Sequence, residues 1–203
     1  MRFSQRTLKK LHEAFLHIKN RKYNKNIFSS INLYFEDESR FGLFTRQKRV
    51  LTAKGVKPIC PYQHRFENTY LFGSFSPVNG DSFVLELPYC NTDTFQVYLN
   101  EFSIQKPDEL KIIILDNGAF HKAKRLKIPP NIVLLFLPPY SPELNPAEKI
   151  WRYLKDEISL RVYKNIRELQ DDLCKIITDN LNDDRVKSIT GNKFYKENFL
   201  VVF

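Results

Sequence analysis

Two short apolar runs in the second half of the chain constrain its fold more than any other feature. Residues 112–115 are consecutive aliphatic residues, and Asp116 follows them directly. A continuous run of this kind is expected of a central strand that is covered on both faces. A second apolar run, at residues 132–137, ends at residues 138–139, two prolines that stop a strand. Together the runs predict a sheet with helices packed on it.

The first half of the chain has the pattern of one helix followed by a β-meander. Residues 4–19 repeat apolar side chains at three- and four-residue spacing, which predicts an amphipathic helix with a basic face. Residues 31–36 have the alternation of a strand with one buried face, and Asp37 falls at its end. Further β-type segments lie at residues 49–53, 56–60, 69–75 and 82–87, the last after the hairpin turn at residues 79–80.

Helical patterns dominate the rest of the chain. Regular apolar spacing at residues 95–102 marks a short helix. Asn145 suits the N-cap of a second helix and Pro146 its first position, and Trp151 lies on the apolar stripe of that helix. A last helix is expected to start at Asn165. A meander followed by strand–helix–strand–helix predicts an α/β (α+β) fold with one mixed sheet and flanking helices.

The net charge of +9 is unevenly placed along the 203 residues. Residues 1–26 hold eight Lys or Arg and one Glu, residues 40–65 hold seven Lys or Arg and no acid, and residues 67–120 hold two bases and eight acids. Basic blocks displace counterions from phosphates, which favours a polyanion as partner; a solvated basic surface is the alternative. We expect a basic helix and linker at residues 1–26 and a folded domain at residues 27–203.

The sequence also indicates where the protein works. The apolar runs are far shorter than a membrane span and no apolar leader opens the chain, so we expect a cytoplasmic protein without a membrane partner. Cys60, Cys90 and Cys174 are widely spaced and lack any CxxC pair. We therefore expect reduced, at least partly buried thiols and neither a disulfide nor a zinc site.

Three acids are placed for metal-dependent chemistry. Asp37 and Asp116 each follow a predicted strand, and Glu148 lies in the first turn of the helix after the next strand. They converge if the two strands are neighbours, and carboxylates on rigid elements can hold the divalent ions that assist phosphodiester cleavage. Each acid also has a structural interpretation: a solvated turn acid for Asp37, an Asp-Asn-Gly turn for Asp116 and a capping box for Glu148.

His121 is a further candidate because it stands among basic residues five positions after Asp116. It is expected to contact DNA, to tune the metal site or to be a structural histidine, and the pattern leaves all three open. Trp151 is expected in the core.

Five ordered segments make the chain similar to a known family. They are residues 34–44 (YFEDESRFGLF), 54–59 (KGVKPI), 70–81 (YLFGSFSPVNGD), 114–133 (ILDNGAFHKAKRLKIPPNIV) and 137–156 (LPPYSPELNPAEKIWRYLKD). The sequence resembles the DDE endonuclease domain of bacterial insertion-sequence transposases, in the six-thirty-type branch of the mariner superfamily.

The resemblance implies an RNase H-like fold and a metal-dependent nuclease. In that family the acids that match Asp37, Asp116 and Glu148 ligate two divalent ions, Mg²⁺ or Mn²⁺. The implied reaction is hydrolysis of double-stranded DNA at the ends of a mobile element, after which the freed 3′-hydroxyls attack target DNA. Family members usually act as homodimers. The resemblance also implies a nucleoid-associated protein of the bacterial cytoplasm.

Basic residues around these acids are the candidates for DNA contacts. They are Arg40, Arg46, Lys48, Arg49, Lys54, His121, Lys122 and Lys124. The family's paired helix-turn-helix domains are not found in this sequence, and some members encode them in a separate frame joined by frameshifting. Two alternatives stay open: a catalytically silent remnant that binds DNA or dimerises, and a host nuclease of the same fold that acts on junctions or hybrids.

Overall fold

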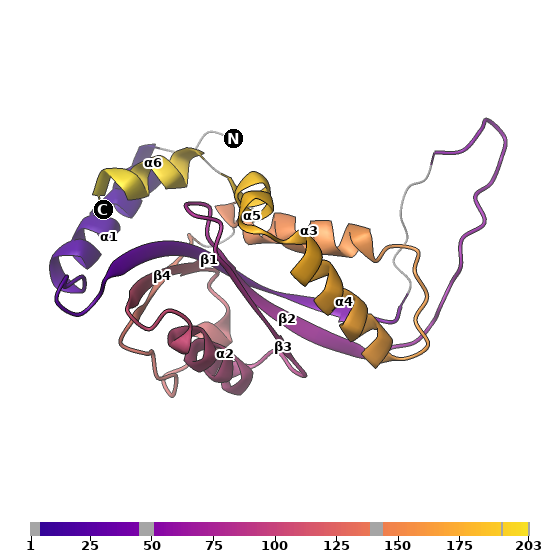
Figure 1. Cartoon of the computed structure of the whole chain (residues 1–203), viewed down its shortest axis with the longest axis horizontal. Coiled ribbons are helices and arrows are strands. Elements are labelled where there is room, and N and C mark those ends of the chain that lie inside the picture. The colour runs from indigo at the N-terminus through magenta and orange to yellow at the C-terminus, as the bar shows by residue number, and fades with distance from the viewer. Residues whose placement is uncertain (1–4, 45–50, 139–143, 192, 203) are drawn as a thin grey trace.

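The structure is a computed structural model that describes residues 5–44, 51–138, 144–191 and 193–202 (Figure 1). The described strands are β1 (Ser30–Gly42), β2 (Asn68–Phe75), β3 (Ser82–Leu87), β4 (Glu109–Leu115) and β5 (Ile132–Phe136). The described helices are α1 (Gln5–Arg21), α2 (Thr92–Ile104), the 3-10 helix η1 (Ala119–Lys122), α3 (Ala147–Glu157), α4 (Ile166–Asn180), α5 (Asp183–Thr190) and α6 (Lys193–Val202). None of the described helices is long and apolar enough to cross a membrane.

The strands form one mixed sheet in the order β3-β2-β1-β4-β5. β1, β2 and β3 pair antiparallel as a meander, whereas β4 is parallel to β1 and β5 is parallel to β4. All seven residues of β4 are buried, as predicted for a strand covered on both faces. The predicted meander and the mixed sheet are therefore confirmed.

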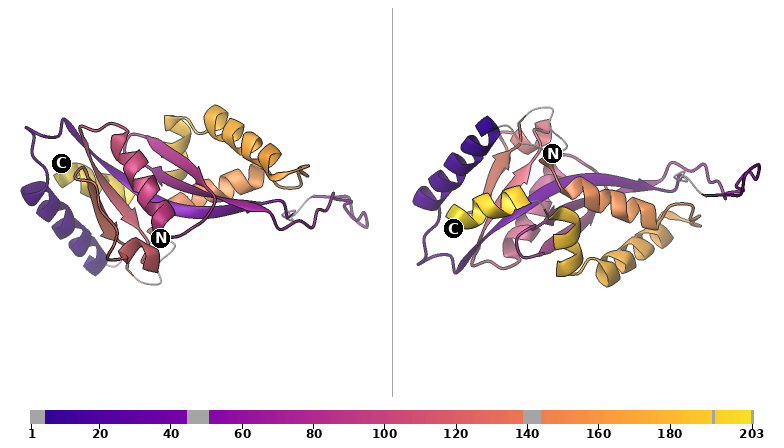
Figure 2. Two further views of the ribbon diagram at one scale, coloured as in Figure 1. Left: turned by 90° about the horizontal axis from the view of Figure 1, so that it is seen from below. Right: turned by 90° about the horizontal axis from the view of Figure 1, so that it is seen from above.

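Helices cover both faces of the sheet, with α2 on one side and α3, α4 and α5 on the other (Figures 1 and 2). Alternate residues of each strand divide between the two layers, because successive side chains of a strand point to opposite faces. Phe35 and Ile114 join the core under α3, whereas Tyr34 and Ile113 join the core under α2. α1 packs on α6 through Phe15 and Phe199, whose ring centroids lie 5.8 Å apart.

A glycine allows α3 to approach the sheet closely. Gly73 of β2 pairs with Asp37 of β1, and a Cβ atom at position 73 would lie 2.6 Å from Cη2 of Trp151. Trp151 is 3% exposed and meets Phe41 and Phe75 edge to face, with centroid distances of 6.2 and 5.3 Å. Its predicted place in the core is confirmed.

The segment between β1 and β2 departs from prediction. Residues 51–67, which we call the arm, contain no strand and extend away from the body of the protein (Figure 1). The predicted strand at residues 56–60 is therefore wrong, and the predicted segment at residues 49–53 has no strand in its described part, residues 51–53. Leu51 and Ile59 are fully exposed, because no strand or helix in the described parts of the chain covers them. A β-pattern without a pairing partner leaves its backbone groups to water.

Three smaller expectations also need correction. β1 does not end at Asp37 but continues to Gly42, because β2 pairs with it along that whole stretch. The helix that starts after Asn165 is not the last, since α5 and α6 follow it. All three cysteines are exposed, whereas at least partial burial was expected; Cys60 lies in the arm.

Replacement of Gly73 by Ala is expected to destabilise the fold. The added methyl group would press on Trp151 and the Phe75 ring, whose nearest atom would lie 2.7 Å away. Overpacking of this kind costs roughly 1–3 kcal/mol. Urea unfolding followed by tryptophan fluorescence measures the loss, and Ser82→Ala, at an exposed position of β3, serves as the control. An unchanged free energy of unfolding for Gly73→Ala would contradict this account of the packing.

Candidate active site

The parallel pairing of β1 and β4 brings two acids to the same edge of the sheet. Phe35 pairs with Ile114 in this register, and Asp37 and Asp116 each lie two residues further along. Residues two apart on a strand share a face, so both aspartates follow residues of the core under α3. The sequence predicts that these acids converge if their two strands are neighbours. β1 and β4 are neighbours, so this condition is fulfilled.

The third acid, Glu148, is brought to this edge by the start of α3. Asn145 fastens that start to β1, because its Nδ2 donates to the backbone oxygen of Glu36 at 2.7 Å. Its Oδ1 accepts from the N–H of Ala147 at 3.1 Å, so Asn145 caps the helix although α3 begins at Ala147, one residue later than predicted. Glu148 lies exposed in the first turn, beside the buried Ala147.

The charges of the other two carboxylates act on Asp37. The pKa of Asp37 is raised from 3.8 to about 7. Burial is the largest cause, and the neighbouring charges of Glu38, Glu148 and Asp116 add to it. The charged groups that raise this pKa are all carboxylates, so negative charge gathers around Asp37. Divalent cations prefer carboxylate oxygens, so the donor set fits a Mg²⁺ or Mn²⁺ ion.

The structural interpretation is wrong for Asp37 and correct for Asp116. Asp37 is not a turn acid, because it lies within β1 and its carboxyl is largely buried. Asp116 does form the expected turn: its Oδ1 accepts from the N–H of Gly118 at 2.7 Å. This turn occupies only one of its two carboxylate oxygens, so the turn and a metal-binding role are compatible.

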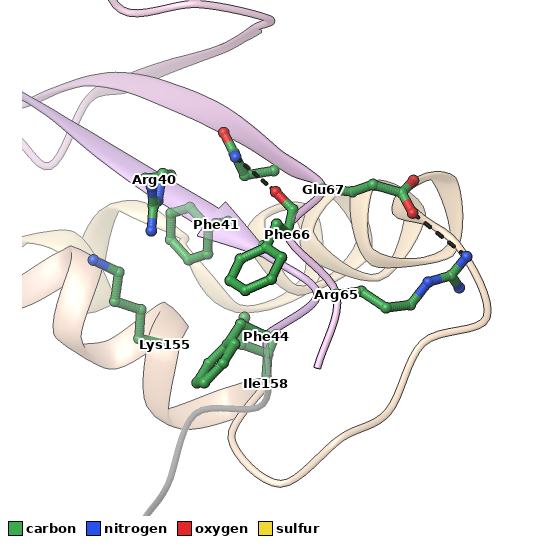
Figure 3. Close-up of a pocket in the computed structure, with 10 residues that line it drawn as sticks. Arg40, Phe41, Phe44, Arg65, Phe66, Glu67, Lys155 and Ile158 are labelled. Carbon is green, nitrogen blue, oxygen red and sulfur yellow. Dashed lines mark hydrogen bonds and ion pairs between the residues drawn. The ribbon is translucent and has the colours of Figure 1, made fainter. Parts of the chain in front are cut away.

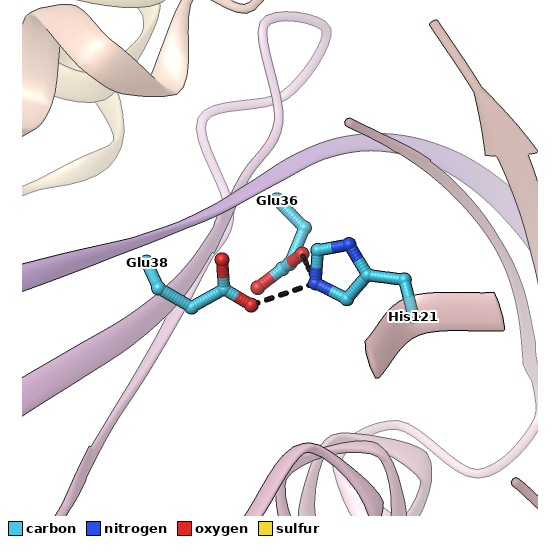
Figure 4. A group of neighbouring side chains, drawn as sticks. All are labelled: Glu36, Glu38 and His121. Carbon is cyan, nitrogen blue, oxygen red and sulfur yellow. Dashed lines mark hydrogen bonds and ion pairs between the residues drawn. The ribbon is translucent and has the colours of Figure 1, made fainter. Parts of the chain in front are cut away.

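A second polar cluster lies on the opposite face of β1, and the sequence analysis did not identify two of its members. Glu36 and Glu38 flank Asp37 and therefore point away from it, toward His121 of η1 (Figure 4). Nε2 of His121 lies 2.8 Å from Oε1 of Glu38 and 3.9 Å from Oε2 of Glu36. The available signal was the alternation of β1, which placed two glutamates on the face of the buried Tyr34.

Burial dominates the electrostatics of this second cluster. Glu36 is 0% exposed, and burial together with the charges of Glu38 and Asp37 holds its pKa well above the usual range. His121 is 3% exposed, which places it inside the protein and not on a DNA-contacting surface. Of the three roles considered for His121, its position favours tuning of the metal site or a structural role.

The predicted DNA-contacting lysines and arginines lie on exposed segments where the structure describes them. Lys54 is in the arm, Lys122 and Lys124 lie in and after η1, and all three are exposed. Arg46, Lys48 and Arg49 lie outside the described residues. Arg40 of β1 is exposed and lines a groove of about 1010 Å³.

This groove combines basic and aromatic side chains at the base of the arm. Figure 3 shows Arg40 and Lys155 beside the rings of Phe41, Phe44 and Phe66. Phe44 and Phe66 are 48% and 73% exposed, so their faces are open to solvent. Such a surface suits a polyanion that also carries flat rings.

Comparison with solved structures shows which folds this one resembles. The whole chain superposes on 64% of the Mos1 transposase in its paired-end complex with the left transposon end, with a TM-score of 0.62 and 15% sequence identity. The Mos1 mariner paired-end complex with Mn gives the same TM-score at 16% identity over 64% of that chain. The fold is thus the predicted RNase H-like one, and the chain spans slightly less than two thirds of these relatives.

Sequence comparison gives the family. The chain is 39% identical over 107 residues to the uncharacterized protein y4pE/y4sA of Sinorhizobium fredii (strain NBRC 101917 / NGR234), a match that covers 52% of this chain and 79% of that protein. The model of the DDE superfamily endonuclease family matches residues 32–170, which include all three carboxylates and more than half of the chain. The chain therefore belongs to the DDE superfamily of endonucleases.

Proposed function

We propose that this chain is a transposase catalytic domain that cleaves DNA at the ends of a mobile element and joins the freed ends to target DNA. Asp37, Asp116 and Glu148 are its metal ligands. The observation that carries the proposal is the convergence of these acids from β1, β4 and α3, which makes Glu148 and Asp116 act on the pKa of Asp37.

The chain's own residues supply position and charge for this reaction. Two Mg²⁺ or Mn²⁺ ions, when bound, would activate the attacking hydroxyl and stabilise the leaving oxygen. The use of either ion is in keeping with Mos1 paired-end complexes that contain Mg or Mn. Asp37 is held within β1, and Asp116 is held by the Gly118 turn, so neither carboxylate has to reorganise.

Double-stranded DNA is the proposed partner. The exposed bases Arg40, Lys54, Lys122 and Lys124 lie on three different segments, β1, the arm and the region of η1. Their charges would replace counterions along a phosphate backbone. The named neighbours are complexes of Mos1 transposase with transposon ends, which is in keeping with such a partner.

The remaining parts of the proposal concern assembly. We propose a homodimer, supported by the apolar residues Leu51, Ile59 and Phe66 that the arm exposes. We also propose that a helix-turn-helix domain, separately encoded or fused by frameshifting, reads the element ends. Residues 1–26 serve as the basic helix and linker, residues 27–203 as the catalytic domain, and the protein works on DNA in the bacterial cytoplasm.

Substitution of Asp116 by Asn is expected to abolish metal-dependent cleavage. The change keeps the side-chain shape but removes a charged ligand, so nicking of element-end DNA in Mg²⁺ should fall by at least about a hundredfold. Asp179→Asn, at an exposed position of α4, is the matched control and should cleave normally. Undiminished cleavage by Asp116→Asn would overturn the assignment. A wild-type protein that binds DNA but never cleaves would favour the silent remnant.

Substitution of Asp37 by Asn is expected to stabilise the metal-free protein. Folding raises the pKa of this carboxyl from 3.8 to about 7, so ionisation disfavours the folded state, and the penalty grows as the pH rises from about 4 to 7. Asn removes this penalty. At pH 8 and in EDTA we expect a gain of about 1 kcal/mol or more, seen as a rise in Tm of roughly 2–4 °C per kcal/mol.

The pH dependence provides the control for this measurement. Below about pH 4 the Asp37 carboxyl is largely protonated in both states, so the two proteins should unfold at similar temperatures. A Tm at pH 8 that is equal to or below that of wild type would show that Asp37 is not under electrostatic stress.

Replacement of Arg40 by Gln is expected to weaken DNA binding and its salt dependence. If Arg40 contacts one phosphate, the slope of log K against log salt should become shallower by about 1. Fluorescence anisotropy with labelled duplex measures both quantities. Lys196→Gln, on the exposed surface of α6, provides the control and should leave the slope unchanged. An unchanged slope for Arg40→Gln would remove this residue from the interface.

A further inference from the structure

A chain of contacts links the buried cluster on one face of β1 to the proposed metal ligand Asp116. Oε1 of Glu38 lies 2.8 Å from Nε2 of His121, which is hydrogen-bond distance. The other ring nitrogen of His121, Nδ1, lies 3.0 Å from Oδ1 of Asp116. One imidazole ring thus bridges two carboxylates that come from different strands.

The bridging ring is held firmly by its surroundings. His121 is 3% exposed and lies against Phe95 of α2 and its neighbour Phe120, with centroid distances of 4.5 and 4.1 Å. Its backbone N–H donates to the oxygen of Gly118 at 3.1 Å. Packing on a helix and a bonded turn leaves the ring little freedom to rotate, so it can serve as a fixed support.

All the described contacts of the Asp116 carboxylate fall on one oxygen. Oδ1 accepts from the N–H of Gly118 at 2.7 Å and faces Nδ1 of His121, whereas the side chain as a whole is 63% exposed. Nδ1 has no well-aligned hydrogen bond, so this contact is a close approach of ring and carboxylate and not a hydrogen bond. With Oδ1 held from two sides, Oδ2 is the oxygen presented to a cation.

Gly118 leaves the room that this arrangement needs. A Cβ atom at position 118 would lie 3.0 Å from Nδ1 of His121 and 3.1 Å from Oδ1 of Asp116. Both distances are tighter than ordinary contacts, so any larger residue would crowd the contact between histidine and aspartate. The turn residue and the bridging ring therefore act on the same carboxylate oxygen.

The charges around the ring explain why a base is placed here. Glu38 and Glu36 lie on one side of it and Asp116 on the other, and the carboxyl oxygens of Glu36 have no hydrogen-bond partner among the described residues. Without the imidazole, Glu38 and Asp116 would face each other with nothing but repulsion between them. A histidine between them keeps both carboxylates in defined positions.

We infer that Glu38 and His121 are positioning residues, which orient the Asp116 carboxylate so that it can bind a divalent cation. This inference rests on the proposed function, because it needs Asp116 to be a metal ligand. Neither residue has to touch the cation or the DNA. Supports of this kind behind metal ligands typically change metal affinity by roughly 10- to 100-fold when they are removed.

Two near-isosteric variants separate the two contacts of the ring. The amide of Asn occupies the place of Nδ1, so His121→Asn keeps the contact with Asp116 and loses that with Glu38. The amide of Gln reaches the place of Nε2, so His121→Gln does the reverse. We expect Mn²⁺ affinity, measured from the electron paramagnetic resonance signal of free Mn²⁺, to fall about 10- to 100-fold in His121→Gln and clearly less in His121→Asn.

A double-mutant cycle tests whether Glu38 acts through His121. We expect Glu38→Ala to weaken Mn²⁺ binding in the wild-type background but to add little in the His121→Ala background. His17→Ala, at an exposed position of α1, is the matched control and should bind Mn²⁺ as wild type does. Thermal unfolding in EDTA is recorded for every variant, and the comparison of Asn with Gln is read only for variants that unfold cooperatively.

The outcomes distinguish this inference from the proposed function. If Asp116→Asn loses Mn²⁺ binding while His121→Gln and His121→Ala bind as wild type does, the positioning role is overturned and the proposed function stands. If Asp116→Asn itself binds Mn²⁺ normally, the proposed function fails. A variant of His121 that lowers the number of bound ions, and not their affinity, would also overturn the positioning role, because it would make the cluster of Glu36, Glu38 and His121 a metal site.

Discussion

The pairing of β1 with its two neighbours is the constraint on which the rest of the site depends. β1 has β2 on one side and β4 on the other, and its register with both fixes where every one of its side chains points. The parallel register with β4 sets Asp37 beside Asp116, and the antiparallel register with β2 sets Asp37 beside Gly73. A slip of one residue would send Asp37 to the opposite face and exchange it with a glutamate.

Because successive side chains of β1 point to opposite faces of the sheet, its acids are divided between two clusters. Asp37 faces α3, and the charges of Asp116 and Glu148 raise its pKa. Glu36 and Glu38 face α2, where they lie next to the buried imidazole of His121. Folding must tolerate the repulsion within the first group. A stress of this kind is common at functional sites, because the interactions that would relieve it are left to the ligand.

The third acid depends on packing more than on pairing. α3 is brought to the edge of β1 by two contacts, the bridge from Asn145 to the backbone of β1 and the close approach of Trp151 to Gly73. Neither contact involves Glu148 itself. The position of the third carboxylate is therefore a property of the helix as a rigid body, and it can be lost by changes in residues that bear no charge.

The sequence by itself determined most of the strands, the buried helix face and the family. β2, β3 and β4, the core position of Trp151 and the cap at Asn165 follow from local patterns that report which side chains are buried. Motifs around Asp37, Asp116 and Glu148 pointed to the three acids, although spacing alone left each with a structural alternative. Only the tertiary structure decided that the arm has no strand and that Glu36, Glu38 and His121 meet. The physical reason is that a pattern records the tendency of one segment, whereas a strand needs a pairing partner and a polar cluster needs neighbours that lie far away in the sequence.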